Sequence, residues 1–187
     1  MAKKAQSTLI NMLLSLTVIA IVAAAALALV NKVTEEPIAQ AKKAKTDEAI
    51  KAVLPQYDHT EELDVEGTAC VLAYNEADSL VGVAVNSGSD KGFGGHLGVM
   101  YGFDTDGNIT GYQILETSET PGLGAKADKW FQADGKGCVI GKNPGQNTIK
   151  VAKDGGEVDA ISGSTITSRA FCEAVATAFE TYQKINK

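Results

Sequence analysis

The hydrophobic and polar positions of this chain divide it into three stretches, and the first is a nearly continuous apolar run from Leu9 to Val30. Only Asn11, Ser15 and Thr17 interrupt it. About 20 apolar residues in a helix span the hydrocarbon core of a bilayer, whereas the apolar part of a secretory signal is typically about 7 to 15 residues long. The pattern therefore predicts a single N-terminal transmembrane anchor within residues 1–32.

The flanks of this run leave two questions open. Ala26-Leu27-Ala28 resembles a signal-peptidase site, so a cleaved signal is the alternative to a retained anchor. Lysines lie on both sides of the run, and the positive-inside rule therefore gives no clear orientation. These lysines are Lys3, Lys4, Lys32, Lys42, Lys43 and Lys45. A short N-terminal tail is most simply left behind while the larger part crosses, so we expect a single-pass protein of the cytoplasmic (inner) membrane with an extracytoplasmic domain.

The second stretch, residues 33–55, is polar and rich in alanine and lysine, which favours an exposed helix. Glu35-Glu36-Pro37 predicts the start of this helix, because acidic residues and proline both suit a first turn. Pro55 predicts its end at about Leu54. Two interpretations of this juxtamembrane segment are equally open: a stalk next to the membrane, or the first helix of the following domain.

The third stretch, residues 56–187, begins with short apolar runs that predict an antiparallel meander. The predicted strands are Ala69–Tyr74, Leu80–Val85, Gly98–Phe103 and Ile109–Leu115. Asp104–Asn108 contains an Asp-Gly pair, which is typical of a tight turn. Further elements are expected as a short helix at Ala125–Phe131, strands at Asn147–Ala152 and Glu157–Ile161, and an amphipathic helix from about Thr165 to Ile185. The expected fold class is α+β, an antiparallel sheet with packing helices behind the membrane helix.

Composition excludes several classes of function. The net charge is −6 and the basic residues do not gather in one predicted element, so a nucleic-acid partner is not expected. Three cysteines and two histidines are far apart in sequence, so no metal site is expected either. Cys70 and Cys138 could pair in an oxidising compartment, but buried free thiols are the simpler expectation.

Three segments could carry chemistry. Asp159–Ser168 is rich in hydroxyl side chains and leads into the final helix, which suits either an anion site or an ordinary N-cap. Glu119–Gly124 reads Glu-Thr-Pro-Gly-Leu-Gly, a stiff loop that either approaches a flat ligand or simply turns the chain. Lys91–His96 is a glycine-dense connection before a strand. No serine-nucleophile or nucleotide-loop motif accompanies them, so no catalytic residue is expected.

Taken in this order, these segments make the chain resemble the flavin-carrying subunits of redox-driven ion pumps. The apolar N-terminal run and an Asp-x-x-Ser-Gly-x-Thr pattern completed by Thr165 carry the resemblance, which covers essentially the whole chain. The nearest family is the G subunit of the Rnf complex. The related C subunit of the sodium-pumping quinone reductase shares the FMN-binding domain but is generally longer.

The resemblance implies FMN attached covalently through its phosphate to the hydroxyl of Thr165. It further implies a separate FAD-dependent flavin transferase, whose recognition motif begins at Asp159. The family usually has alanine where this chain has Ser164, which adds a competing hydroxyl. The expected cofactor-binding residues form two sets, one at the phosphate and one against the isoalloxazine ring. They are Ser162, Gly163, Ser164, Thr165, Thr167 and Ser168 in the first set, and Glu119, Thr120, Pro121, Gly122, Leu123 and Gly124 in the second.

The function implied is an electron-transfer subunit of an ion-translocating oxidoreductase. In that family the complex moves electrons between ferredoxin and NAD and couples this to Na⁺ or H⁺ translocation, so other integral membrane and redox subunits are the expected partners. Two alternatives stay open from the sequence: the flavin subunit of a sodium-pumping quinone reductase, and a membrane-tethered extracytoplasmic binding domain without a cofactor.

Overall fold

The computed structural model describes residues 8–186, and these fall into two compact units divided between Ala44 and Lys45. The first unit consists of the N-terminal part of a single long helix, α1, which runs from Leu9 to Val53. This helix is long and apolar enough to cross a membrane, and none of its apolar membrane-length window is buried in the protein.

The predicted start of a separate helix at Glu35-Glu36-Pro37 is wrong, because Pro37 lies inside α1. Proline removes one backbone N–H from a helix and crowds the preceding turn. The residues on both sides are mostly alanine, lysine and glutamate, which are strong helix formers, and the helix continues through the proline.

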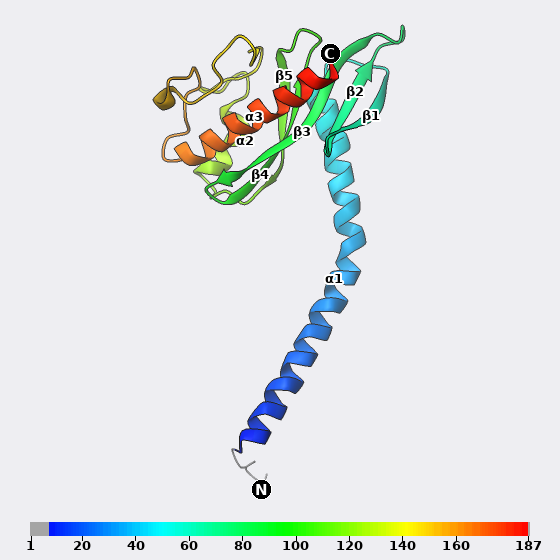
Figure 1. Cartoon of the computed structure of the whole chain (residues 1–187), viewed down its shortest axis with the longest axis vertical. Helices are drawn as coiled ribbons and strands as arrows, with labels where there is room; N and C mark the ends of the chain where they lie inside the picture. The colour runs from blue at the N-terminus through cyan, green and yellow to red at the C-terminus, as the bar shows by residue number, and fades with distance from the viewer. Residues whose placement is uncertain (1–7, 187) are drawn as a thin grey trace. The chain divides into compact units, whose positions relative to one another are not determined.

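The second unit is built on a five-stranded sheet in which every neighbouring pair of strands is antiparallel and strand order follows chain order (Figure 1). The strands are β1 (His59–Val65), β2 (Thr68–Tyr74), β3 (Leu80–Gly92), β4 (Gly95–Phe103) and β5 (Ile109–Thr117). This confirms the antiparallel meander. The turn at Asp104–Asn108 is also present, with Asp104 Oδ1 accepting from Asp106 N–H at 2.9 Å and from Asn108 N–H at 2.8 Å.

Strand β1 was not predicted, because its sequence has almost no alternation of apolar and polar residues. Six of its seven residues are exposed, so it lies at the edge of the sheet without a core-facing row. A two-residue turn, Glu66-Gly67, joins it to β2, and both of these residues have positive φ. That backbone geometry is the one that closes a tight hairpin, and it fixes the β1–β2 register without help from hydrophobic burial.

Strands β3 and β4 are longer than predicted. The glycine-dense segment Lys91–His96 was expected as a connection, but most of it is strand, and the turn is confined to Phe93-Gly94. The extension of β3 is polar because it packs against a helix through hydrogen bonds. Ser87 Oγ donates to the carbonyl of Ala174 at 2.9 Å, and Ser89 Oγ donates to Glu173 at 2.7 Å.

The two predicted strands at Asn147–Ala152 and Glu157–Ile161 are absent. An isolated parallel bridge between Val151 and Val158 is all that remains of them. The chain turns back on itself at Asp154-Gly155-Gly156, where Ala152 N–H donates to the Val158 carbonyl and Gly156 N–H donates to that of Val151. The first of these bonds belongs to the bridge, and the second closes the turn between the two segments, so no longer ladder forms. A short 3₁₀ helix, Ala152–Asp154, lies between them.

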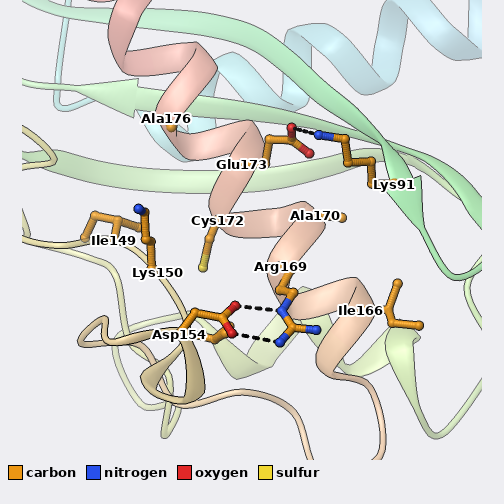
Figure 2. Close-up of a pocket in the computed structure, with 11 residues that line it drawn as sticks. Lys91, Ile149, Lys150, Asp154, Ile166, Arg169, Ala170, Cys172, Glu173 and Ala176 are labelled. Atoms are coloured by element: carbon orange, nitrogen blue, oxygen red, sulfur yellow. Dashed lines mark hydrogen bonds and ion pairs between the residues drawn. The ribbon is translucent and has the colours of Figure 1, made fainter.

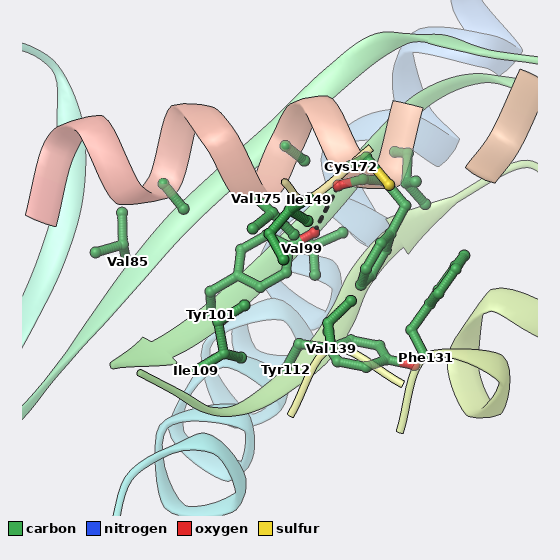
Figure 3. Close-up of a cluster of buried hydrophobic side chains, with 14 of the residues drawn as sticks. Val85, Val99, Tyr101, Ile109, Tyr112, Phe131, Val139, Ile149, Cys172 and Val175 are labelled. Atoms are coloured by element: carbon green, nitrogen blue, oxygen red, sulfur yellow. Dashed lines mark hydrogen bonds between the residues drawn. The ribbon is translucent and has the colours of Figure 1, made fainter. Parts of the chain in front are cut away.

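The predicted helix at Ala125–Phe131 is shorter and partly 3₁₀, with a turn at Gly124–Lys126 followed by α2 at Ala127–Trp130. The predicted final helix is confirmed as α3, Thr165–Ile185. It crosses one face of the sheet (Figure 1), and its Phe171 contacts a cluster of aromatic rings. Tyr101, Tyr112 and Phe131 of this cluster are labelled in Figure 3. The Phe171 ring stacks on that of Phe131, with 4.1 Å between the ring centroids. It makes T-shaped contacts with Tyr112 and Tyr101, at centroid distances of 4.8 and 5.6 Å.

The opposite face of the sheet is covered by the last turns of α1. Ala49 and Val53 are buried there with Met100. The helix approaches the strands closely because two glycines lie beneath it. A side chain at Gly102 would overlap the Val53 carbonyl, and one at Gly111 would lie 3.0 Å from Val53 Cα.

Candidate functional site

Residues from all three of the segments singled out in the sequence line one groove of about 390 Å³ at the start of α3. The loop Glu119–Gly124 follows β5 and forms one wall, and the hydroxyl-rich segment before α3 forms another. The lining residues are Phe93, Glu119, Thr120, Leu123, Gly124, Lys153, Gly163, Ser164, Thr165 and Ile166. The sequence-predicted residues Ser162, Pro121, Gly122, Thr167 and Ser168 lie in the same segments but outside this lining.

The first turn of α3 presents unused backbone donors to the groove. Its first hydrogen bond is from Ser168 N–H to the Ser164 carbonyl, at 3.0 Å. The N–H groups of Thr165, Ile166 and Thr167 therefore precede any helical acceptor. Ser164 occupies the N-cap position but its side chain makes no capping hydrogen bond. The ordinary N-cap interpretation of this segment thus lacks its defining contact, whereas an anion would satisfy these donors.

A buried hydroxyl lies next to these donors. Thr167 is fully buried, and its Oγ1 has no hydrogen-bond partner among residues 8–186. A side chain at Gly124 would overlap Glu119 Oε2 and lie 2.8 Å from Thr167 Oγ1, so the loop, the carboxylate and the hydroxyl converge at this glycine. Unpaired buried hydroxyls are costly and therefore rare. The arrangement suits a bound group with acceptor oxygens.

Glu119 is largely buried although it carries a carboxylate. Its Oε1 accepts from the N–H of Gly94 at 3.2 Å, which ties the loop to the β3–β4 turn. The loop itself turns tightly, with Leu123 N–H donating to the Thr120 carbonyl at 3.1 Å. Gly122 has φ +79°, a conformation that favours glycine. These contacts hold the Pro-Gly loop against the β3–β4 turn, and its residues share the groove lining with the start of α3.

The Ser168 hydroxyl, unlike that of Thr167, is fully hydrogen-bonded within the protein. Its buried Oγ accepts from Ile161 N–H at 2.9 Å and donates to the Ser164 carbonyl at 3.0 Å. The proton of this hydroxyl is thus used within the protein. Gly163, with φ +79°, provides the sharp turn between Ile161 and Ser164, and a side chain there would touch Leu123 at 3.4 Å.

Asp159 is exposed, and its backbone carbonyl accepts a hydrogen bond from the Trp130 indole at 2.8 Å. Gly137 lies close beneath it, since a side chain there would meet that carbonyl at 2.5 Å. The start of the Asp-x-x-Ser-Gly-x-Thr pattern is therefore held by its backbone while its carboxylate stays accessible.

Three residues of the groove were not predicted as cofactor-binding residues: Phe93, Lys153 and Ile166. Phe93 and Ile166 lie within segments that the sequence singled out, whereas Lys153 does not. Phe93 is 70% exposed at the tip of the β3–β4 turn. Its glycine neighbours were the available signal, because an exposed aromatic between glycines is unusual in a plain turn. Lys153 follows from no pattern in the sequence and reaches the groove only through the fold of residues 151–158.

A second groove, of about 570 Å³, runs along α3 beyond Ile166, which lines both grooves (Figure 2). Its floor includes Ala170 and Cys172, and burial raises the pKa of the Cys172 thiol to about 12. At its edge Arg169 donates two hydrogen bonds to Asp154, at 2.6 and 2.7 Å, which lowers the pKa of that carboxyl.

Among residues 8–186, no group of three or more metal-ligating side chains comes together. All three cysteines are free thiols, with Cys70 and Cys172 buried and Cys138 partly buried.

Comparison with known proteins shows the family of the chain. Residues 92–180 match the FMN-binding domain family, a range that includes both the Glu119–Gly124 loop and Thr165. The chain is 34% identical to the G subunit of the Na(+)-translocating ferredoxin:NAD(+) oxidoreductase complex of Acetobacterium woodii, over 93% of this chain and 91% of that protein. It is also 30% identical to the G subunit of the ion-translocating oxidoreductase complex of Shewanella amazonensis, over 91% and 86% of the two chains. The corresponding G subunit of Methanosarcina acetivorans is 34% identical, over 91% and 92%.

These relatives confirm the resemblance found in the sequence. They are subunits of multi-subunit membrane complexes, and the apolar helix α1 agrees with single-pass anchoring. The chain belongs to the G-subunit family of ion-translocating oxidoreductase complexes, as a membrane-anchored electron-transfer subunit that carries an FMN-binding domain.

Proposed function

We propose that this chain holds FMN covalently, through a phosphoester to Thr165 Oγ1, and that it relays electrons within its complex. The observation that carries the proposal is the shared groove: Thr165 lies on the first turn of α3, beside three backbone N–H groups without helical acceptors and opposite the Glu119–Gly124 loop. When bound, FMN supplies the redox chemistry by accepting and donating electrons.

Attachment requires a transferase that uses FAD. The hydroxyl oxygen of Thr165 forms a new bond to the FMN phosphorus, the phosphoanhydride bond of FAD breaks, AMP leaves, and the hydroxyl proton is released. The resulting diester carries one negative charge. The amides of Thr165–Thr167 and the positive end of the α3 dipole stabilise an anion at this position.

The remaining residues of the groove have separate roles. The Thr167 hydroxyl would donate a hydrogen bond to the bound group. In support, it has no partner among residues 8–186 and lies next to Gly124, which lines the groove. Ser162, Gly163 and Ser164 shape the turn around the phosphate. Leu123 and Phe93, which are 44% and 70% exposed, provide apolar surface for a flat ring.

The chain's cellular setting follows from the same proposal. The FMN-binding domain lies on the extracytoplasmic side of the cytoplasmic membrane, and its electron partners are other integral membrane and redox subunits. By analogy with the Acetobacterium woodii relative, the complex passes electrons between ferredoxin and NAD and translocates an ion, which is Na⁺ in that relative.

Intact-mass analysis of the full chain tests the attachment. Co-expression with the flavin transferase is expected to add the mass of one FMN less one water, and Thr165→Ala abolishes the increase. Ser164→Ala is the matched control and keeps it, because it removes the neighbouring hydroxyl alone. An increase that survives Thr165→Ala but is lost in Ser164→Ala would move the attachment to Ser164, and no increase in the wild type would refute the proposal.

A further inference from the structure

Lys153 is the cation of the flavin groove. Of the ten residues that line the groove, it is the one lysine or arginine, and Glu119 is the one carboxylate. Glu119 is largely buried and accepts a hydrogen bond from Gly94. Lys153 is exposed, and its ammonium group makes no ion pair or hydrogen bond with any of residues 8–186. An unpaired lysine therefore borders the site proposed for a phosphodiester.

The backbone that carries Lys153 is held firmly in place. The 3₁₀ helix Ala152–Asp154 is closed by a hydrogen bond from Gly155 N–H to the Ala152 carbonyl, at 3.1 Å. Its flanks are tied by bonds from Ala152 N–H to the Val158 carbonyl, at 2.9 Å, and from Gly156 N–H to the Val151 carbonyl, at 3.2 Å. These bonds leave the Lys153 side chain as the movable part of this turn.

A salt bridge joins this turn to α3. Arg169 binds both carboxylate oxygens of Asp154, as the dashed lines in Figure 2 show. Arg169 lies four residues after Thr165, which is one helical turn further along α3. The pair has two consequences. It fixes the Lys153 turn beside the first turns of α3, and it occupies the neighbouring carboxylate, which would otherwise neutralise Lys153.

We propose that Lys153 is a positioning residue that pairs with the phosphodiester on Thr165, which rests on the attachment proposed above. The backbone amides bind the phosphate oxygens at fixed positions, whereas a lysine acts as a mobile point charge on a flexible stem. An anion in this groove gives Lys153 the partner that the protein itself does not provide. The charge pair forms only when the flavin is present, so it links flavin attachment to the stability of the domain.

A cycle of four states tests this pairing: the wild type and the Lys153→Gln variant, each with and without attached flavin. The full chain is used in detergent, produced with or without the transferase, and unfolded with urea. Without flavin, Lys153→Gln is expected to leave the folding equilibrium constant unchanged, because Lys153 has no partner to lose. With flavin, the constant is expected to fall about two- to fivefold, as is typical of an exposed charge pair. Raising the salt concentration reduces the difference.

Two variants serve as controls. Lys153→Arg keeps the charge and is expected to behave as the wild type. Lys150→Gln removes a lysine three residues away that lines the second groove but not this one, and it is expected to have the same small effect with and without flavin. Flavin fluorescence follows only the loaded molecules, so incomplete loading of a variant does not blur the comparison. A Lys153→Gln chain that takes no flavin, while both controls load normally, also supports the requirement for a charge here.

An equal effect of Lys153→Gln in the loaded and flavin-free chains, or no effect in either, overturns the pairing. The two proposals fail differently. If the wild-type chain takes up no flavin, the attachment and the pairing both fall, and the mass measurement shows this first. If flavin attaches at Thr165 and the cycle shows no coupling, the pairing alone is refuted.

Discussion

Thr167 and Ser168 are adjacent hydroxyl residues with opposite hydrogen bonding, and this difference gives a sharp test of the site. Both are fully buried. Ser168 donates one hydrogen bond and accepts another, whereas Thr167 Oγ1 has no partner within residues 8–186. A hydroxyl buried without a partner costs about 1–3 kcal/mol. The flavin-free chain therefore bears this cost, and under the proposed attachment a phosphate oxygen would accept from the hydroxyl and remove it.

Thr167→Val replaces the hydroxyl with a methyl group of similar size. Both residues are β-branched, so their helix propensities are nearly equal and the change isolates the hydrogen bond. In the flavin-free chain we expect the free energy of unfolding to rise by about 1–3 kcal/mol. In the flavin-loaded chain this gain is cancelled or reversed, because a hydrogen bond to a charged acceptor contributes about 1.5–3 kcal/mol.

Ser168→Ala is the matched control. It leaves the Ile161 N–H without its acceptor, so the free energy of unfolding is expected to fall by about 1–3 kcal/mol whether or not flavin is attached. Urea unfolding of the full chain in detergent measures both variants, followed by the fluorescence of Trp130, the one tryptophan of the sequence. If Thr167→Val destabilises the flavin-free chain as Ser168→Ala does, the Thr167 hydroxyl is hydrogen-bonded within the protein. The proposal that this hydroxyl donates to the flavin phosphate would then be wrong.

Three further predictions concern packing, the loop and pH. Phe171→Ala is expected to lower the free energy of unfolding by about 3–5 kcal/mol, because it removes the ring that contacts Phe131, Tyr101 and Tyr112. Urea unfolding measures this change, and a loss under about 1 kcal/mol would show that the ring is not central to the core. Gly124→Ala is expected to lower the free energy of unfolding by about 1–3 kcal/mol, because the new methyl group overlaps Glu119. Adding Glu119→Ala to this variant is expected to recover part of the loss, and strictly additive effects of the two substitutions would show that the side chains do not collide. The hydrogen bonds from Arg169 lower the pKa of Asp154 in the folded chain, so the pair's stabilisation is present at neutral pH and is lost as the pH falls through the folded pKa. The melting temperature of the wild type should therefore fall more steeply in acid than that of Asp154→Asn, and parallel pH profiles would refute this assignment.

Predictions from the sequence succeeded where a hydrophobic period or a turn residue encodes the structure locally. The amphipathic pattern predicted a helix from about Thr165 to Ile185, and α3 has these bounds. Phe171, Val175, Ala178 and Tyr182, which are spaced by three or four residues, are buried on one face of it. Strand β1 gave no such signal, since it is an exposed edge strand held by its turn and its neighbour.

The candidate site could be predicted only in part, because only some of its residues belong to local sequence motifs. Thr165 and the Glu119–Gly124 loop could be found because local motifs carry them. Lys153 could not be found in this way. Its position in the groove depends on the Arg169–Asp154 pair and on a turn in a region where the sequence predicted two strands. Apolar residues around an Asp-Gly-Gly sequence predict a hairpin, but here the backbone bonds close locally and the strands do not form.

The exposure of the groove gives a physical reason for the proposed covalent bond to the flavin. Phe93 and Leu123 are 70% and 44% exposed, so a ring that rests on them stays in contact with water and binds weakly by burial alone. The proposed attachment at Thr165 would make the ring's contact with the groove intramolecular. An effective concentration in the millimolar range would then take the place of a low dissociation constant. The groove can thus remain open, which an electron carrier needs in order to bring its flavin close to another subunit. A deep pocket would hold free FMN more tightly but would bury the ring that must exchange electrons.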